Sequence, residues 1–309
     1  MLFRSVAGTH GKTTTSTLIA HLLKSAGLEC TAFLGGISKN FNSNLLIGQV
    51  QNGRHIIVVE ADEYDRSFLT LYPDIAVITS MDPDHLDIYG DSNQMLKTYK
   101  EFASQVKSNG CLIYKKGLAV GEINARSLNY ALQSPADQFA SDININHHQY
   151  HFNWTGRGFA FNDLTTGLPG EHNVENAVAA IAVAVELGLS EEVIRKGLES
   201  YQGVNRRFDY QVKSENLIYI DDYAHHPEEL RACISSVKAL YPSKKITGVF
   251  QPHLFSRTRD FADGFAESLS MLDELLLLEI YPARELPIQG VTAAMILGKV
   301  TCPDRKSTR

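Results

Sequence analysis

The sequence predicts an α/β protein with a mostly parallel sheet in a first domain, followed by a second, shorter α/β domain. Three observations support this prediction. A glycine-containing stretch, SVAGTHGKTTT (5–15), separates a short apolar run from a segment with helical periodicity. Two apolar runs, HIIVVEAD (55–62) and DIAVITSMDPDHLD (74–87), are typical of buried parallel strands and end in acidic residues. Apolar runs and helical patterns alternate again after residue 209.

The elements of the first domain follow from periodicity and boundary residues. Apolar side chains recur at helical spacing from Lys12 to Ala26, and Gly27 ends that helix. Ser190 is expected to cap a later helix. The predicted strands are 3–7, 55–62, 74–87 and 111–117, with one antiparallel strand (142–154) inside a poorly patterned stretch from 118 to 166. The predicted helices are 12–26, 94–106, 173–187 and 191–201.

A domain boundary is expected near YQGVNRRFD (201–209), which gives domains of 1–203 and 204–309. Pro227 suits the first turn of a helix because its missing N–H is not needed there. The predicted strands of the second domain are 217–224, 245–252 and 274–283, and the predicted helices are 227–240 and 261–269. We expect only the start of a final helix before a polar tail, CPDRKSTR (302–309).

The composition narrows the class of protein. With 44% hydrophobic and 21% charged residues, the chain reads as globular and soluble, and a net charge of -6 argues against general binding to nucleic acid or to an anionic membrane. The longest continuous apolar run is too short to span a bilayer, and no secretory signal is visible. Four cysteines without a close pair indicate reduced thiols in a cytoplasmic protein. Oligomeric state is left open.

The stretch 5–15 has the Gly-Lys-Thr ending of a phosphate-binding loop. Gly8 and Gly11 let the backbone of Thr9 and His10 curl around phosphate oxygens. Lys12 would bring a positive charge to the phosphates, and Thr13 a hydroxyl to a magnesium ion. The general pattern asks for a glycine at position 6, where this chain has valine, so the loop is either a chance match or a shorter variety.

Acidic residues at two neighbouring strand ends suggest a metal site. Glu60 and Asp62 follow one predicted strand, and His85 lies in DPDHLD at the end of the next. Oxygen ligands beside a phosphate loop are what a divalent ion requires. Solvated acids at loop starts are the alternative, and the nearby loop favours the metal.

Other polar groups collect where strands end or helices begin. Asn176 lies near a helix start, where asparagine is also simply a good cap. DDYAHHPEE (221–229) and FQPHLFSRTRD (250–260) place acids, histidines and arginines after predicted strands. An arginine in these segments could bind a carboxylate or phosphate through two hydrogen bonds. The alternative interpretation is a surface ion pair. The histidine cluster HHQYH (147–151) is interpreted as an exposed strand face rather than a metal site.

With these blocks assembled, the chain resembles the Mur ligases. The resemblance rests on AGTHGKTTT (7–15), EADEYDRSFL (60–69), DPDHLDIYG (82–90), GEHNVENAVAA (170–180), GVNRRFD (203–209), DDYAHHPEE (221–229) and FQPHLFSRTRD (250–260). It implies a central ATP-binding phosphate-loop domain in 1–203 and an incomplete Rossmann-like C-terminal domain in 204–309, with an N-terminal sugar-binding domain absent. MLFRS and DRKSTR look foreign to the family pattern, which predicts a fragment with non-native ends.

The resemblance implies an ATP- and Mg²⁺-dependent ligation of L-alanine to UDP-N-acetylmuramate through an acyl phosphate, in cell-wall synthesis. Implied roles are phosphate and magnesium binding by Lys12 and Thr13, metal ligation by Glu60 and His85, an adenine contact by Asn176 and a ribose contact by Asp222. His225 and Arg257 would act near the acyl phosphate and the amino acid. Leu254 stands where many relatives have arginine, so carboxylate recognition there is expected from Arg257 or Arg259. Alternatives are a related ligase that attaches a recycled tripeptide and a nucleotide-binding module without turnover.

Overall fold

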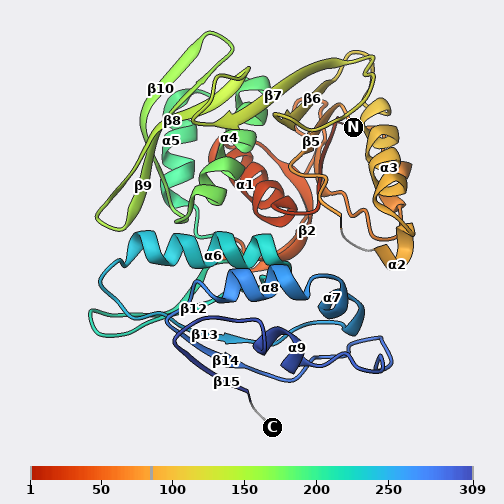
Figure 1. The fold of residues 1–309 in the computed structure, drawn as a ribbon. Helices are drawn as coiled ribbons and strands as arrows, with labels where there is room; N and C mark the ends of the chain where they lie inside the picture. Colours follow the sequence, from red (N-terminus) through yellow and green to blue (C-terminus); the bar gives the residue numbers. More distant parts are fainter. Residues whose placement is uncertain (1, 84–85, 308–309) are drawn as a thin grey trace. The chain divides into compact units, whose positions relative to one another are not determined.

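The computed structural model describes residues 2–83 and 86–307. The chain divides into two compact units, Met1–Gln211 and Val212–Arg309 (Figure 1). The domain boundary predicted at 203/204 lies within the first unit. Each unit has its own sheet and its own hydrophobic core.

The first unit is built on one large sheet. Its strands are β1 (Leu2–Ala7), β2 (Cys30–Ser38), β3 (Ser43–Leu46), β4 (Ile56–Glu60), β5 (Ile75–Ile78), β6 (Cys111–Lys115), β7 (Arg126–Leu132), β8 (Gln138–Asn146), β9 (Gln149–Gly156) and β10 (Phe159–Thr166). Among the described residues they are ordered β10-β9-β8-β7-β6-β5-β1-β4-β2-β3. The strands from β2 to β8 in this order pair in parallel, whereas β3, β9 and β10 are antiparallel to their neighbours. The predicted α/β class with a mostly parallel sheet is confirmed.

Helices cover the sheet of this unit. They are α1 (Lys12–Ser25), α2 (Leu86–Tyr89), α3 (Ser92–Ser104), α4 (Glu171–Glu186) and α5 (Glu191–Ser200), with a 3-10 turn η1 (Ser67–Thr70). Helix α1 packs on β1, β2 and β4 and against α4 and α5. Helix α3 packs through Tyr99 and Phe102 on a cluster that includes Ala7 and Ile78, and Phe102 stacks on Phe68 of η1 at 4.9 Å between ring centroids. Buried apolar faces on both sides explain the continuous hydrophobicity of the strands.

The register of the parallel strands places the predicted site residues beside one another. Val6 of β1 lies opposite Glu60 of β4, and Ala7 lies opposite Ile78 of β5. The loop that follows β1 therefore emerges between the carboxyl end of β4 and the segment after β5. In open α/β sheets this edge is where ligands bind.

Two sequence predictions in the first unit are wrong in detail. The stretch 142–154 is part of a hairpin, since β8 and β9 are joined at His147 and His148, which adopt φ values of 49° and 60°. A two-residue hairpin turn of type I′ requires positive φ at both central residues, and histidine at these positions gives no sequence signal for this conformation. The cluster 147–151 is therefore a turn and a strand start, not one strand face. Ser190 stands at the start of α5, but its side chain makes no capping hydrogen bond.

The second unit contains a smaller parallel sheet. Its elements are β12 (Ile218–Asp221), α6 (Pro227–Leu240), β13 (Thr247–Phe250), α7 (Phe255–Asp260), α8 (Ala262–Leu269), β14 (Glu274–Leu277), α9 (Ala293–Leu297) and β15 (Asp304–Ser307). Strands β13, β14 and β15 pair in parallel, whereas β12 pairs with β11 (Asp209–Lys213) in a separate ribbon. Helix α6 begins with a capping box in which His226 and Glu229 bond to each other's backbone. Phe265 of α8 and Leu275 and Leu277 of β14 are fully buried in the core.

The polar tail predicted from the sequence is partly a strand. Asp304 to Ser307 pair with Glu274 to Leu277 in parallel register. The strand lies at the edge of the sheet and carries mostly exposed polar side chains. Charged edge strands limit unwanted pairing but lack an apolar signal, which is why the sequence does not reveal this one. Across residues 2–83 and 86–307, no helix combines the length and apolar character needed to cross a lipid bilayer.

Candidate active site

The loop after β1 has the backbone conformation that its glycines predict. Gly8 and Gly11 have φ values of 135° and 80°, a region that other residues adopt only with strain. A Cβ on Gly8 would lie 2.8 Å from the backbone nitrogen of Ser80, and one on Gly11 would lie 2.5 Å from Oδ1 of Asn176. Both conformation and space therefore require glycine at these two positions.

The segment after β5 holds the loop in place. The His10 N–H donates to Oγ of Ser80 at 2.8 Å, and Oγ1 of Thr9 donates to the carbonyl of Asp82 at 2.7 Å. Oγ1 of Thr79 donates to the carbonyl of His10. Helix α1 then begins at Lys12, with no side-chain cap and no acidic residue in its first turn. The first amides of a helix lack intrahelical partners, so this uncapped end suits an anion.

Lys12 does not point freely to solvent in this structure. Its Nζ lies 2.8 Å and 2.7 Å from the two carboxylate oxygens of Glu63. The side chains of Lys12 and Glu63 are 14% and 1% exposed. Burial raises the pKa of Glu63, while the ammonium of Lys12 opposes that rise. Glu63 was not among the predicted site residues.

Thr13 and Glu60 are brought together as the sequence predicted. Oγ1 of Thr13 donates to Oε1 of Glu60 at 2.9 Å, and the N–H of Gly35 in β2 donates to Oε2 at 2.7 Å. Their oxygens are the hard ligands that Mg²⁺ prefers, so the donor set fits this ion. Within the described residues there is no group of three or more histidines, cysteines or acids that could hold a metal. His85, the third predicted ligand, lies outside them.

Asn176 lies at the base of the loop. It is buried in α4; its Oδ1 accepts a hydrogen bond from Oγ1 of Thr15 at 3.3 Å, and its Nδ2 donates to Oδ1 of Asn173 at 3.4 Å. Because its carboxamide also abuts Gly11, it supports the loop and the first turn of α1. The predicted contact of Asn176 with adenine stays a prediction.

The second unit brings three of its candidate residues into one electrostatic group. Burial lowers the pKa of His253, and electrostatic interactions with Arg257, His225 and Arg284 lower it further, whereas Glu285 raises it. Arg257 is buried in α7, and Nδ1 of His225 lies 2.9 Å from the carbonyl of Tyr223. The guanidinium groups of Arg257 and Arg284 would attract an anionic ligand, while the carboxylate of Glu285 opposes this attraction.

Two further residues of the second unit that the sequence singles out, Asp222 and Leu254, have structural contacts. Oδ1 of Asp222 accepts a hydrogen bond from the N–H of Ala224 at 2.8 Å, directly after β12. Leu254 is buried at the start of α7 with a φ of 74° and donates its N–H to the carbonyl of Tyr281. Its side chain is buried among the hydrophobic residues of the protein.

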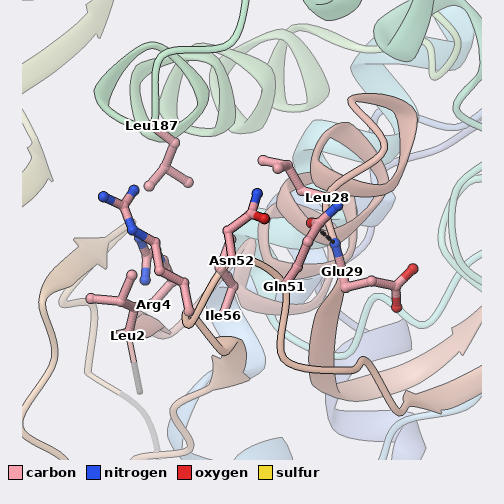
Figure 2. Close-up of a pocket in the computed structure, with 9 residues that line it drawn as sticks. Leu2, Arg4, Leu28, Glu29, Gln51, Asn52, Ile56 and Leu187 are labelled. Atoms are coloured by element: carbon pink, nitrogen blue, oxygen red, sulfur yellow. Dashed lines mark hydrogen bonds between the residues drawn. The ribbon is translucent and has the colours of Figure 1, made fainter.

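A separate cavity of about 320 Å³ lies at the opposite end of β1 (Figure 2). Arg4 lines it together with Leu28 and Leu187, which follow the ends of α1 and α4. Arg4 as a whole residue is 4% exposed, and among the described residues its Nε and Nη1 have no hydrogen-bond partner. Because the loop leaves the other end of β1, this cavity is not part of the loop site.

These features define an α/β protein with a phosphate-binding loop at the carboxyl edge of a parallel sheet. The chain belongs to the Mur ligase family, since the profile of the Mur ligase middle domain matches residues 6–184 and that of the Mur ligase glutamate ligase domain matches residues 206–307. The family predicted from the sequence blocks is thereby confirmed.

Individual relatives agree with this membership. The UDP-N-acetylmuramate–L-alanine ligase of Flavobacterium johnsoniae is 50% identical over 302 residues, which cover 98% of this chain and 65% of the relative. The crystal structure of UDP-N-acetylmuramate–alanine ligase from Thermotoga maritima matches with a TM-score of 0.81 and 26% identity, over 99% of this chain and 67% of that one. MurF ligase from Thermotoga maritima, solved with ADP, shares the fold with a TM-score of 0.77 at 19% identity, over 100% of this chain and 70% of its own. The chain thus spans about two thirds of the length of these proteins.

Proposed function

We propose that this protein acts in an ATP-dependent ligase that joins L-alanine to UDP-N-acetylmuramate in cytoplasmic peptidoglycan synthesis. The observation that carries the proposal is the loop site, with Lys12, Thr13 and Glu60 gathered at the carboxyl edge of the sheet. It occurs in a chain that is 50% identical to a relative named for this reaction.

The loop would bind the triphosphate of ATP. The backbone of residues 8–11 and the uncapped start of α1 would face the phosphate oxygens, and Lys12 would add a positive charge. Thr13 and Glu60, with His85 as a further proposed ligand, would hold magnesium. A bound Mg²⁺ would neutralise charge on the transferred phosphoryl group.

The remaining candidates would complete the nucleotide and acyl sites. Asn176 beside Gly11 is proposed to contact adenine, and Asp222 after β12 is proposed to bind the ribose hydroxyls. His225 and Arg257 would stabilise negative charge on the acyl phosphate and on the alanine carboxylate. Their proximity to His253 supports a site for anions in the second unit.

The proposed reaction has two steps. An oxygen of the muramoyl carboxylate attacks the γ-phosphorus of ATP, the bond to the β-phosphate oxygen breaks, and ADP leaves. The amine of L-alanine then attacks the acyl carbon, loses a proton, and inorganic phosphate leaves with the bonding electron pair. Both steps depend on positioning the reactants and on neutralising negative charge. The loop, His225 and Arg257 would provide both.

A chimaera tests the proposal. This chain would replace the matching part of the Flavobacterium johnsoniae ligase, and the product would be assayed with ATP, UDP-N-acetylmuramate and either L-alanine or a tripeptide. We expect ligation of L-alanine. Preferential ligation of the tripeptide would instead indicate a recycling ligase. A folded chimaera that binds ATP and ligates neither would indicate a nucleotide-binding module without turnover.

A further inference from the structure

The contact between Lys12 and Glu63 has a feature that the proposed nucleotide site does not explain. A lysine that ends a phosphate-binding loop is expected to reach the phosphates. Here its Nζ lies within 2.8 Å of both oxygens of a carboxylate that is 1% exposed. Two of the three ammonium donors are therefore already occupied by a negatively charged group inside the protein.

Glu63 is fixed in this position by its surroundings. It follows β4 after only two intervening residues, and the hydroxyl of Tyr89 donates to its backbone carbonyl. The guanidinium of Arg66 lies over the Tyr89 ring, 5.1 Å from its centroid. The carboxylate thus belongs to a packed structure and is not a mobile surface group. Its ion pair with Lys12 is correspondingly better defined than an exposed one.

A nucleotide phosphate would compete with this carboxylate. Both are oxygen anions that accept charge-assisted hydrogen bonds from an ammonium group. If Lys12 stayed on Glu63, the phosphate would meet a neutral pair in place of a free positive charge, with a carboxylate nearby that repels it. Full use of Lys12 by a phosphate therefore requires that its contact with Glu63 be given up.

We propose that Glu63 is a positioning residue that occupies Lys12 in place of phosphate, and that nucleotide binding exchanges the carboxylate for phosphate oxygens. The proposal rests on nucleotide binding at the loop, as proposed above. The contact with Glu63 weakens nucleotide affinity, while it keeps Lys12 paired when the loop is empty. Without such a partner, Lys12 would lie largely buried and uncompensated.

The proposed magnesium ligands Thr13 and Glu60 make contacts that do not involve Glu63, so the two parts of the site can be tested separately. Glu60 is held by Thr13 and by the N–H of Gly35, and not by Lys12. Removal of the Glu63 charge should consequently change the affinity for ADP even when magnesium is chelated. A role of Glu63 as a metal ligand would change affinity only when magnesium is present.

The experiment is calorimetric titration of the 309-residue chain with ADP in excess EDTA, comparing the parent with Glu63→Gln and Glu63→Asp. We expect about tenfold tighter binding for Glu63→Gln, which corresponds to about 1.4 kcal/mol. The shorter carboxylate of Glu63→Asp should give an intermediate gain. The matched control is Glu29→Gln, which breaks a half-exposed ion pair with Lys24 of the same 2.8 Å length and should leave the affinity unchanged.

If Glu63 only supported the structure of the loop, Glu63→Gln would damage the loop and would not raise the affinity for ADP. Equal or weaker binding of ADP by folded Glu63→Gln overturns the proposal. If circular dichroism shows that this variant is unfolded, Glu63→Asp decides, and an unchanged dissociation constant overturns the exchange. If the parent itself does not bind ADP, the nucleotide site proposed above fails, and the exchange fails with it.

Discussion

The substitution Gly11→Ala tests the loop geometry directly. Gly11 has a φ of 80°, and an added Cβ would lie 2.5 Å from Oδ1 of Asn176. Alanine would therefore be strained in its backbone and would also displace the carboxamide that supports the loop. Gly188 provides the matched control, because its φ is 79° and no atom lies within 4 Å of its added Cβ.

The size of the effect follows from these two contributions. Positive φ costs an alanine about 1–2 kcal/mol, and this cost applies to both variants. Displacing Asn176 also breaks its hydrogen bond with Thr15, which adds about 1 kcal/mol for Gly11→Ala alone. For a unit of this size, about 1 kcal/mol lowers the Tm by about 2–4 °C. We expect a drop of about 4–12 °C for Gly11→Ala and about 2–8 °C for Gly188→Ala.

The assay is thermal unfolding of parent and variants, each with and without Mg·ADP. We expect Gly11→Ala to have the lower Tm of the two variants and to lose its stabilisation by nucleotide, whereas Gly188→Ala retains that stabilisation. Equal Tm values for the two variants would refute the steric argument at Asn176. Undiminished nucleotide stabilisation of Gly11→Ala would refute the claim that this loop conformation is needed for binding.

Two further substitutions probe separate parts of the first unit. A Cβ on Gly35 would lie 2.5 Å from Cδ of Glu60, so Gly35→Ala should weaken Mg·ADP binding several-fold in titration calorimetry; an equal loss in EDTA would contradict a metal role for Glu60. Burial lowers the pKa of His21, so below the unfolded-state pKa of about 6.5 the unfolded chain binds more protons than the folded one. Stability is therefore complete above pH 6.5 and falls, by at most about 1.4 kcal/mol per pH unit, as the pH drops toward the folded pKa. His21→Gln should reduce the pH dependence of the free energy of unfolding, measured with denaturant between pH 7 and 5.5. An unchanged slope would show that other groups cause this pH dependence.

The parts of the site that sequence reasoning found depend on local pattern and on parallel pairing. The positions of Gly8 and Gly11 in the loop can be predicted from the sequence because their backbone conformation requires glycine. The meeting of Thr13 with Glu60 follows from β1 and β4 lying side by side, with Val6 opposite Glu60. Once two buried strands with acidic ends are recognised, this edge of the sheet is predictable.

Other features depend on tertiary contacts that leave no local signal. The contact of Glu63 with Lys12 depends on the course of the chain after β4. The sequence shows several acidic residues at this strand end, but it does not show which of them is buried against Lys12. The turn at His147 and His148 has unusual backbone angles without glycine or asparagine. Strand β15 gains its place from pairing with β14 and not from hydrophobicity.

The proposed binding of ATP by the loop requires the ammonium group of Lys12, and a thermal melt of the chain measures this requirement. Parent and Lys12→Ala would be melted with and without Mg·ATP, after circular dichroism has shown that both are folded. A ligand at 100 times its dissociation constant stabilises a protein by about 2.7 kcal/mol. We predict a clear rise in Tm for the parent and none for Lys12→Ala. Equal rises in Tm for both proteins, or no rise for the parent, would show that the loop does not bind ATP through Lys12.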